Sequence, residues 1–252
     1  MVNLYRKRIQ IAPVGFEIDR VVIPAKKEKA EKVYLMVHSI PKEDKAKKYA
    51  AEIQKRLNAA KIETELVYCD WQNIEEITRV ARDLILKEKG NEIAINLASG
   101  SKNHAIGLDR ACMTFRKRDN IHPFYPEAKK WTAFKYPKQQ SEGVVKIKQI
   151  PIHRIIVPEP ELIIALKIIK RDSQDIPMHK GKKGVKKKDL AKSLFGNSEK
   201  VSLTKLQRNV TQKLENTWRA IEIIEVGRTD WISLNSEGRY LRYILNEEET
   251  FG

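Results

Sequence analysis

Residues 93–109 read IAINLASGSKNHAIGLD, a run of strand-forming residues that breaks at Ser99-Gly100-Ser101-Lys102 and resumes with helical spacing. The pattern predicts a strand, a tight polar turn and a helix. The first N–H groups of a helix lack partners within it and carry the positive end of its dipole, so they suit phosphate or another anion. Gly100 would let a ligand approach the backbone, and Lys102 adds positive charge. An ordinary capped turn explains these residues equally well.

Strands and helices alternate along the N-terminal part of the chain. The segment 19–29 is expected to be a short helix or an irregular connection, broken at Pro24. The first predicted strand lies within 8–18 and ends in the segment 13–17. The other predicted strands are 32–38, 63–69, 122–125, 130–136 and 143–150, and the other predicted helices are 42–60, 73–89 and 105–116. This alternation predicts an α/β fold with a mostly parallel sheet, which we assign to residues 1–150.

A ligand pocket is expected where two loops meet. In open α/β sheets, ligands bind beyond the carboxyl ends of the strands, at the point where strand order reverses. If the first and fourth strands are neighbours, the loops 13–17 and 99–104 face one another there, and the segment 70–72 is placed to line the side. His104 is expected to start the helix near the ligand. The candidate ligand-binding residues are Val14, Gly15, Phe16, Glu17, Asn96, Ser99, Gly100, Ser101, Lys102, Asn103 and His104.

Charge points to a polyanionic partner. The 252 residues carry a formal charge of +16, and the pI is about 9.7; such an excess favours binding to polyanions but says nothing about the fold. The excess is local: residues 178–219 hold twelve Lys and Arg against three Asp and Glu, whereas residues 221–249 hold three against seven. The basic surface is therefore expected in the C-terminal part.

Cysteine usage and hydropathy indicate the compartment. Cys69 and Cys112 are far apart, and neither has a Cys or His partner at metal-binding spacing, so reduced thiols, no metal and no cofactor are expected. No signal peptide is recognisable, and no apolar run approaches the roughly 20 residues that a bilayer requires. We therefore expect a soluble cytoplasmic protein without membrane contact.

A second domain is predicted over residues 151–252. Its predicted helices are 161–170, 187–195, 202–218 and 236–246; a basic loop spans 172–185, and a hairpin pairs 221–226 with 231–234. Three helices followed by a hairpin is the order of a winged helix-turn-helix, in which the third helix enters the DNA major groove and the hairpin lies along the backbone.

The polar face of the third helix supplies the expected DNA contacts. Gln207, Arg208 and Gln212 carry donors suited to base edges, whereas Lys205 and Lys213 suit phosphates. Arg228 lies at the tip of the hairpin. The full set of candidates is Lys186, Lys187, Lys188, Lys205, Gln207, Arg208, Thr211, Gln212, Lys213 and Arg228. The alternative is that these charges merely solvate surface helices; their concentration on the docking elements favours double-stranded DNA.

Three short motifs resemble a known family. GFE at 15–17, ASGSKNH at 98–104 and LNSEGRYLRYIL at 234–245 are similar to segments of archaeal regulators that join a CRISPR-associated Rossmann fold (CARF) domain to a winged helix-turn-helix. The resemblance covers most of the chain. It implies a Rossmann-like sensor domain that forms a homodimer and binds a cyclic oligoadenylate or related nucleotide across the two-fold axis. The ligand loops of the family correspond to Val14–Phe16 and Ser99–Asn103; many members carry a threonine-rich second loop where this chain has SGSK.

These observations together predict a ligand-responsive transcription regulator, not an enzyme. The GxGxxG and GxxxxGK[ST] motifs are absent. Arg116 and His122 match the Arg-x(4–6)-His spacing of ribonucleases fused to CARF domains, but they fall between a helix and a strand of the sheet domain. Some CARF sensors slowly cleave the cyclic nucleotide that they bind; in this chain Ser101 and Lys102 would be the candidate residues for such cleavage. The alternatives are such an enzyme, cleaving cyclic oligonucleotide or RNA, and a DNA-binding protein whose sheet domain only pairs subunits.

Overall fold

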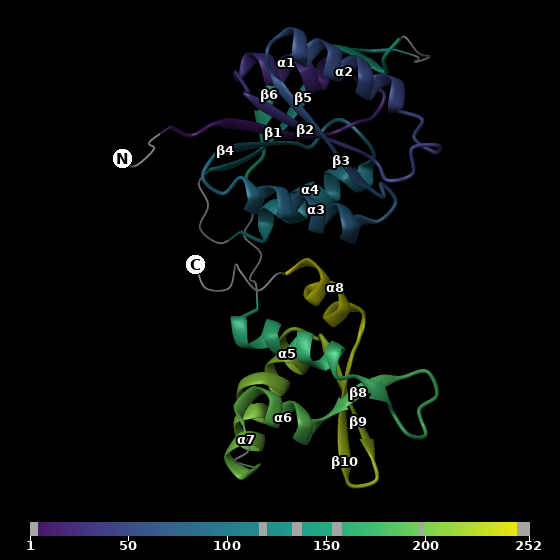
Figure 1. Ribbon diagram of the computed structural model, residues 1–252, viewed down its shortest axis with the longest axis vertical. Helices are drawn as coiled ribbons and strands as arrows, with labels where there is room; N and C mark the ends of the chain where they lie inside the picture. Colours follow the sequence, from purple (N-terminus) through teal and green to yellow (C-terminus); the bar gives the residue numbers. More distant parts are fainter. Residues whose placement is uncertain (1–4, 116–119, 133–137, 153–157, 197–198, 246–252) are drawn as a thin grey trace. The chain divides into compact units, whose positions relative to one another are not determined.

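The computed structural model describes residues 5–115, 120–132, 138–152, 158–196 and 199–245. The chain divides into two compact units, residues 1–156 and 157–252 (Figure 1). Each unit has its own hydrophobic core. Within the described segments, no helix combines the length and the apolar character needed to cross a bilayer.

The first unit is an α/β layer structure around a six-stranded, mostly parallel, Rossmann-like sheet. Strand order is β3-β2-β1-β4-β5-β6, and only β6 runs antiparallel to its neighbour. The strands are β1 (Arg8–Pro13), β2 (Lys32–His38), β3 (Glu63–Cys69), β4 (Glu92–Asn96), β5 (Ile121–Trp131) and β6 (Ser141–Gln149). The helices are α1 (Asp19–Lys27), α2 (Lys47–Ala59), α3 (Ile74–Lys87) and α4 (Lys102–Met113).

Helices cover both faces of this sheet. Figure 1 shows α1 and α2 on one side and α3 and α4 on the other. Alternate residues of β2 enter the two cores: Val33 and Leu35 pack with α1 and α2, whereas Tyr34 packs with α3 and α4. A parallel strand buried on both faces reads as a continuous apolar run, which is why KVYLMVH was recognisable in the sequence.

Helix α1 corrects one expectation, because it continues through Pro24 instead of breaking there. A proline at position 24 cannot donate to the carbonyl of Arg20, four residues earlier. The side chain of Asn96, at the end of β4, supplies the missing donor, with Nδ2 2.8 Å from Arg20 O. The helix therefore survives its proline through a hydrogen bond from a neighbouring strand.

The strands at the end of the first unit also differ from the prediction. The segments 122–125 and 130–131 belong to one long strand, β5, with an irregularity between Glu127 and Ala128. The polar half of β5 lacks an apolar pattern, but it remains a strand because its backbone pairs with β6. The remainder of the predicted strand, residues 133–136, lies outside the described residues.

The second unit combines helices with a four-stranded antiparallel sheet of order β7-β8-β10-β9. Its strands are β7 (Gln174–Asp175), β8 (Lys183–Lys186), β9 (Ile221–Val226) and β10 (Thr229–Leu234). Its helices are α5 (Pro160–Arg171), α6 (Lys187–Phe195), α7 (Glu199–Leu206) and α8 (Ser236–Ile244), and two wide π-helical turns, η1 (Gln207–Thr211) and η2 (Lys213–Thr217), continue α7.

Two expectations for this unit are corrected. The predicted loop 172–185 contains β7 and most of β8, and β8 pairs with β10, with Lys186 opposite Trp231. The predicted helix 202–218 is regular only to Leu206 and then widens: Trp218 N–H bonds to Lys213 O, five residues earlier. Apolar spacing survives such wide turns, so the sequence could not distinguish them from a regular helix.

Candidate functional site

The two predicted loops meet at the carboxyl edge of the sheet. Strands β1 and β4 are parallel neighbours, with Ile11 opposite Ile95, so strand order reverses between them as expected. A Cβ atom built on Gly15 would lie 2.7 Å from Gly100 N, so the loops touch backbone to backbone. Gly100 has φ +88°, and a Cβ there would lie 2.8 Å from Pro13 Cβ. Only glycine fits at either position.

A pocket of about 300 Å³ opens at this meeting point. Seven of the eleven residues expected to bind ligand line it: Val14, Gly15, Phe16, Glu17, Gly100, Ser101 and His104. The other lining residues are His38, Glu43, Asp44, Lys45, Ala46, Trp71 and Gln140. The pocket therefore lies where the segments that follow β1, β2, β3 and β4 come together, although these segments are far apart in the sequence.

The remaining four candidates have other surroundings. Asn96 is buried, donates to Arg20 O and accepts from Ala98 N. Asn103 donates to the carbonyls of Trp71 and Gln72, so it positions the Trp71 loop. Lys102 is exposed at the start of α4, and Ser99 is buried with a hydroxyl that bonds to none of the described residues. The structure does not bring these four into the pocket lining.

Ser101 and His104 cap the start of α4 reciprocally. The Ser101 hydroxyl accepts from His104 N–H at 3.3 Å, and Nδ1 of His104 accepts from Ser101 N–H at 3.2 Å. Burial, and secondarily the nearby His38, lower the pKa of His104 to about 4. The imidazole is thus uncharged at neutral pH. The turn is a capped helix start, which is one of the two interpretations of the sequence, and it also lines the pocket.

Glu17 is held in a buried ion pair behind the pocket. Its carboxylate lies 3.0 Å from Nη1 of Arg20 and accepts from the Ser141 hydroxyl at 2.6 Å. The Arg20 guanidinium also donates to Pro126 O and lies over the rings of Tyr125 and Trp131. Both charged side chains are almost completely buried. This network ties the β1–α1 loop to β5 and β6.

Residues just before and at the start of β6 hold the same loop by its backbone. The side-chain oxygen of Gln139 accepts from Ile18 N–H and Asp19 N–H, both at 2.8 Å, at the start of α1. Gln140 N–H donates to Phe16 O, and Gly143 N–H donates to the Asp19 carboxylate. These contacts explain why Gln140 reaches the pocket; no local sequence pattern reveals a contact over more than 120 residues.

His38 and Trp71 form the opposite wall. Their rings meet edge to face at 6.3 Å. Trp71 was expected near the pocket from its place after β3, but His38 was not singled out. Its position at the end of β2, beside β1, was the available signal, because parallel strands end at the same edge of the sheet.

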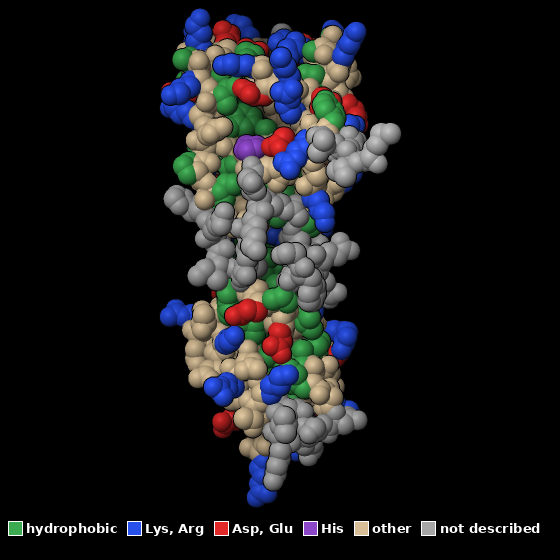
Figure 2. Space-filling model, turned by 90° about the vertical axis from the view of Figure 1, so that its left-hand side faces the viewer, with side chains coloured by type: hydrophobic (Ala, Val, Ile, Leu, Met, Phe, Trp, Pro, Cys, Tyr) green, Lys and Arg blue, Asp and Glu red, His purple; other side chains and the backbone are tan. Residues whose placement is uncertain are grey.

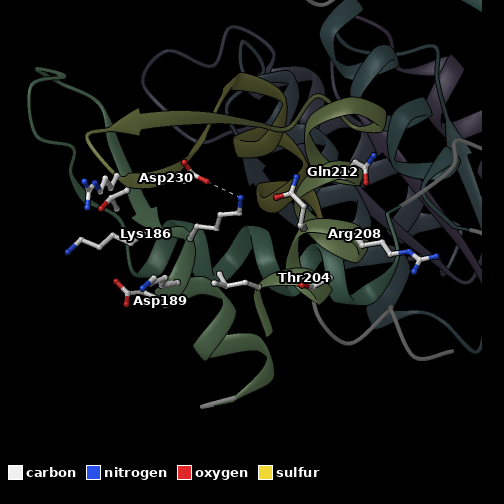
Figure 3. A pocket seen from close by; sticks show the side chains of 12 residues that line it. Lys186, Asp189, Thr204, Arg208, Gln212 and Asp230 are labelled. Carbon is white, nitrogen blue, oxygen red and sulfur yellow. Dashed lines mark hydrogen bonds and ion pairs between the residues drawn. The ribbon is translucent and has the colours of Figure 1, made fainter. Parts of the chain in front are cut away.

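A second candidate site is a groove of about 820 Å³ in residues 157–252. Seven of the ten residues expected to bind DNA line it: Lys186, Lys187, Lys188, Gln207, Arg208, Gln212 and Arg228. The other lining residues are Asp189, Leu203, Thr204, Thr229 and Asp230. Figure 3 shows Arg208 and Gln212 on one side and Lys186 and Asp230 on the other. Asp230 follows directly after Arg228 and Thr229 in the turn, yet was not predicted.

The lining of this groove is mostly basic. It holds five Lys and Arg against two Asp, and one of these, Asp230, pairs with Lys187 at 2.9 Å. On the face shown in Figure 2, by contrast, blue and red side chains are interspersed over the described part of both units. The groove therefore concentrates positive charge where α6, α7 with η1, and the β9–β10 turn come together.

Three predicted DNA contacts lie outside the groove. Thr211 is buried, and its hydroxyl donates to Gln207 O. Lys205 lies over the Phe195 ring, 4.4 Å from its centroid. Lys213 pairs with Glu159 at 3.3 Å. The sequence placed all three side chains on the outer face of the helix. Lys205 and Lys213 are exposed as expected, whereas Thr211 is buried, within the wide turns that follow Leu206.

Candidate metal and ribonuclease residues can be placed only in part. Among the residues that the structure describes, no three His, Cys, Asp or Glu side chains gather into a metal-binding group. His122 bonds to Glu92 at 2.9 Å. Its proposed partner, Arg116, lies outside the described residues. Burial raises the pKa of the Cys69 thiol to about 12, which disfavours the reactive thiolate.

The fold and the two sites define an α/β, Rossmann-like unit with a pocket, followed by a helical unit with a small antiparallel sheet and a basic groove. Residues 8–131 match a family model described as "HFX_2341_N:-like, N-terminal". The uncharacterized protein MJ1513 of Methanocaldococcus jannaschii is 27% identical over 190 residues, which cover 66% of this chain and 57% of the relative. The match thus spans little more than half of that relative's length.

Solved structures show lower similarity. Can2 from Sulfobacillus thermosulfidooxidans, in complex with cyclic tetra-adenylate, is 9% identical with a TM-score of 0.41, covering 92% of this chain and 77% of Can2. Protein VC1899 from Vibrio cholerae is 13% identical with a TM-score of 0.40, covering 93% of this chain and 64% of that one. Csm6 from Enterococcus italicus, bound to cyclic hexa-2'-fluoro-hexa-dAMP, is 13% identical with a TM-score of 0.39, covering 52% of this chain and 36% of Csm6.

Proposed function

We propose that this protein is a ligand-responsive, DNA-binding transcription regulator. The observation that carries the proposal is the groove, because seven residues chosen from the sequence for DNA contact line one continuous surface. Of these, Lys186, Lys187, Lys188 and Arg228 suit phosphates, whereas Arg208 and the two Gln carry donors suited to base edges. Exposed cations and amides in one groove match the mixture of backbone and base contacts that double-stranded DNA requires.

The order of elements supports a winged helix-turn-helix in residues 157–252. Helices α5, α6 and α7 are followed by the β9–β10 hairpin, and β8 adds a third strand to that hairpin. In such domains the third helix enters the major groove and the hairpin lies along the backbone. Here α7 with η1 and the hairpin turn at Arg228 form parts of the same groove.

We also propose that residues 1–156 sense a nucleotide. The resemblance of the GFE and ASGSKNH segments to CARF regulators implies a cyclic oligoadenylate or a related ring, bound by a homodimer. The pocket supports this proposal because residues of both segments line it. In this account the ligand shifts the geometry of the dimer and so the spacing of two winged helices on a palindromic site.

We propose binding without turnover. The Ser101 hydroxyl lies 3.0 Å from Nδ1 of His104, an arrangement that resembles a nucleophile and its base. A base whose pKa is about 4 accepts a proton poorly at neutral pH, however. The rival function, cleavage of cyclic oligonucleotide or RNA, predicts product on chromatography after incubation with cyclic tetra-adenylate and a loss of that product in Lys102→Ala.

Duplex binding over a salt series tests the DNA proposal. Lys188→Ala and Arg228→Ala remove groove cations, whereas Lys205→Ala and Lys213→Ala remove matched charges outside the groove. Each lost phosphate contact should lower the slope of log K against log salt by about 1. We expect that change in the groove variants and not in the other two. Equal effects in all four variants, or a wild-type chain that does not bind duplex DNA, would contradict the proposal.

A further inference from the structure

His104 presents a hydrogen-bond donor whose position is fixed by the helix cap. Nδ1 accepts from Ser101 N–H at 3.2 Å, and the Ser101 hydroxyl lies 3.0 Å from the same atom. Because Nδ1 is used as an acceptor, we assign the single hydrogen of the neutral ring to Nε2. The cap thereby selects one tautomer and one ring orientation.

The Nε2 donor has no partner among the described residues. This atom is buried, and the whole side chain is only 4% exposed although it lines the pocket. A buried donor without an acceptor costs on the order of 1–3 kcal/mol. A ligand atom that accepts this hydrogen bond would therefore recover free energy that the empty pocket lacks.

The charge around the donor does not suit a phosphate. Among the charged side chains that line the pocket, Glu17 is paired with the buried Arg20, which leaves the acidic Glu43 and Asp44 against the basic Lys45. The N–H groups of Ser101 and His104 do not hold an anion, because both are already used in the helix cap. The ring of Trp71, 38% exposed, and that of Phe16 instead offer apolar walls to a flat group.

We propose that the pocket binds the uncharged base of a nucleotide, with His104 Nε2 donating to a ring nitrogen or carbonyl oxygen, and that the phosphate groups stay outside the pocket. This inference rests on the proposed nucleotide sensor and narrows it. It also favours the capped turn over the anion site, the two interpretations that the sequence left open for the start of α4. His104 becomes a residue that determines specificity through a neutral donor.

Two substitutions that are isosteric with each other, His104→Gln and His104→Glu, isolate the donor. Glu and Gln are both standard partners in a helix capping box, because a side-chain oxygen at this position accepts from the backbone. His104→Gln keeps the cap and offers an amide N–H to the pocket; His104→Glu keeps the cap and offers no donor. The probe is adenosine, which carries no phosphate, measured by calorimetry, with inorganic phosphate at equal ionic strength as the second probe. Thermal unfolding checks folding, and His104→Met replaces the Glu variant if that variant does not fold.

We expect adenosine to bind the wild type and His104→Gln with similar affinity and to bind His104→Glu or His104→Met about tenfold or more weakly. Phosphate should not compete with adenosine. Equal affinity of the Gln and Glu variants for adenosine and for cyclic tetra-adenylate would overturn the donor role and leave the sensor proposal intact. Displacement of adenosine by phosphate would also overturn the inference. No binding of adenosine or cyclic tetra-adenylate to the wild type would overturn both.

Discussion

Gly15 and Gly100 are in backbone contact across the carboxyl edge of the sheet, close enough that a Cβ on Gly15 would lie 2.7 Å from Gly100 N and 2.9 Å from its Cα. The pocket depends on this contact, because both loops contribute walls on either side of it. Neither backbone can yield without moving the end of a buried strand.

Gly15→Ala should therefore separate the loops and lower the free energy of unfolding by about 1–3 kcal/mol. Gly100→Ala should have a similar or larger effect, because its φ of +88° is also strained for alanine. Gly90→Ala is the control, since nothing lies within 4 Å of its Cβ position. Urea unfolding measures all three; a Gly15 variant as stable as the Gly90 variant would show that the loops are not in contact.

The sequence was sufficient for elements whose residues share one local pattern. The apolar run of β2 and the helical period of α3 identified buried elements, and their alternation predicted the sheet type. The switch point followed from topology rules once β1 and β4 were taken as neighbours. That step also placed the loop 13–17 opposite the loop 99–104, although the rule does not predict how closely two loops approach.

Features that depend on distant partners could not be predicted. Pro24 indicated a break, since the sequence alone does not show that Asn96 supplies a donor to Arg20 O. Strand β8 has few apolar residues and forms because β10 pairs with it. Gln140 and His38 enter the pocket from elements far from either predicted loop. In each case the deciding contact links residues that no local window contains.

The Asn96–Arg20 hydrogen bond should be coupled to Pro24. Asn96→Ala removes the donor to Arg20 O and should lower the free energy of unfolding by about 1–3 kcal/mol. In a Pro24→Ala background the helix N–H can bond to Arg20 O itself, so the same substitution should cost less. A double-mutant cycle by urea unfolding measures the difference. Strictly additive effects would be inconsistent with this role for Asn96.

The buried pair of Glu17 and Arg20 should be far more sensitive than a surface pair. Glu17→Gln leaves the Arg20 guanidinium buried without its countercharge, and we expect a loss of about 3–5 kcal/mol. Glu127→Gln, which breaks the exposed pair with Lys148, should change stability by less than about 1 kcal/mol. Thermal and urea unfolding of both variants decide the matter; similar small losses would mean that Glu17 is not the partner that Arg20 requires.

His104 should make stability depend on pH below neutrality. Its pKa falls from 6.5 to about 4 on folding, so above pH 6.5 the ring is neutral in both states. Between these values the unfolded chain binds a proton that the folded chain does not, and stability is lost as pH falls, by up to about 3 kcal/mol. His104→Gln should remove this part of the pH dependence. If the urea midpoints of the wild type and His104→Gln change in parallel from pH 7.5 to 4.5, His104 is not a buried, neutral histidine with a lowered pKa.

The most direct test of a ligand-responsive regulator is the affinity for duplex DNA, measured by fluorescence anisotropy at one fixed salt concentration, with and without cyclic tetra-adenylate. The account predicts that the ring changes the Kd for DNA by about fivefold or more, in either direction, as expected for coupled sites. Arg208→Ala should weaken DNA binding, whereas its affinity for cyclic tetra-adenylate, measured by calorimetry, should equal that of the wild type. An unchanged Kd for DNA in a protein that demonstrably holds the ring, or a wild-type chain with no affinity for duplex DNA, would contradict the account.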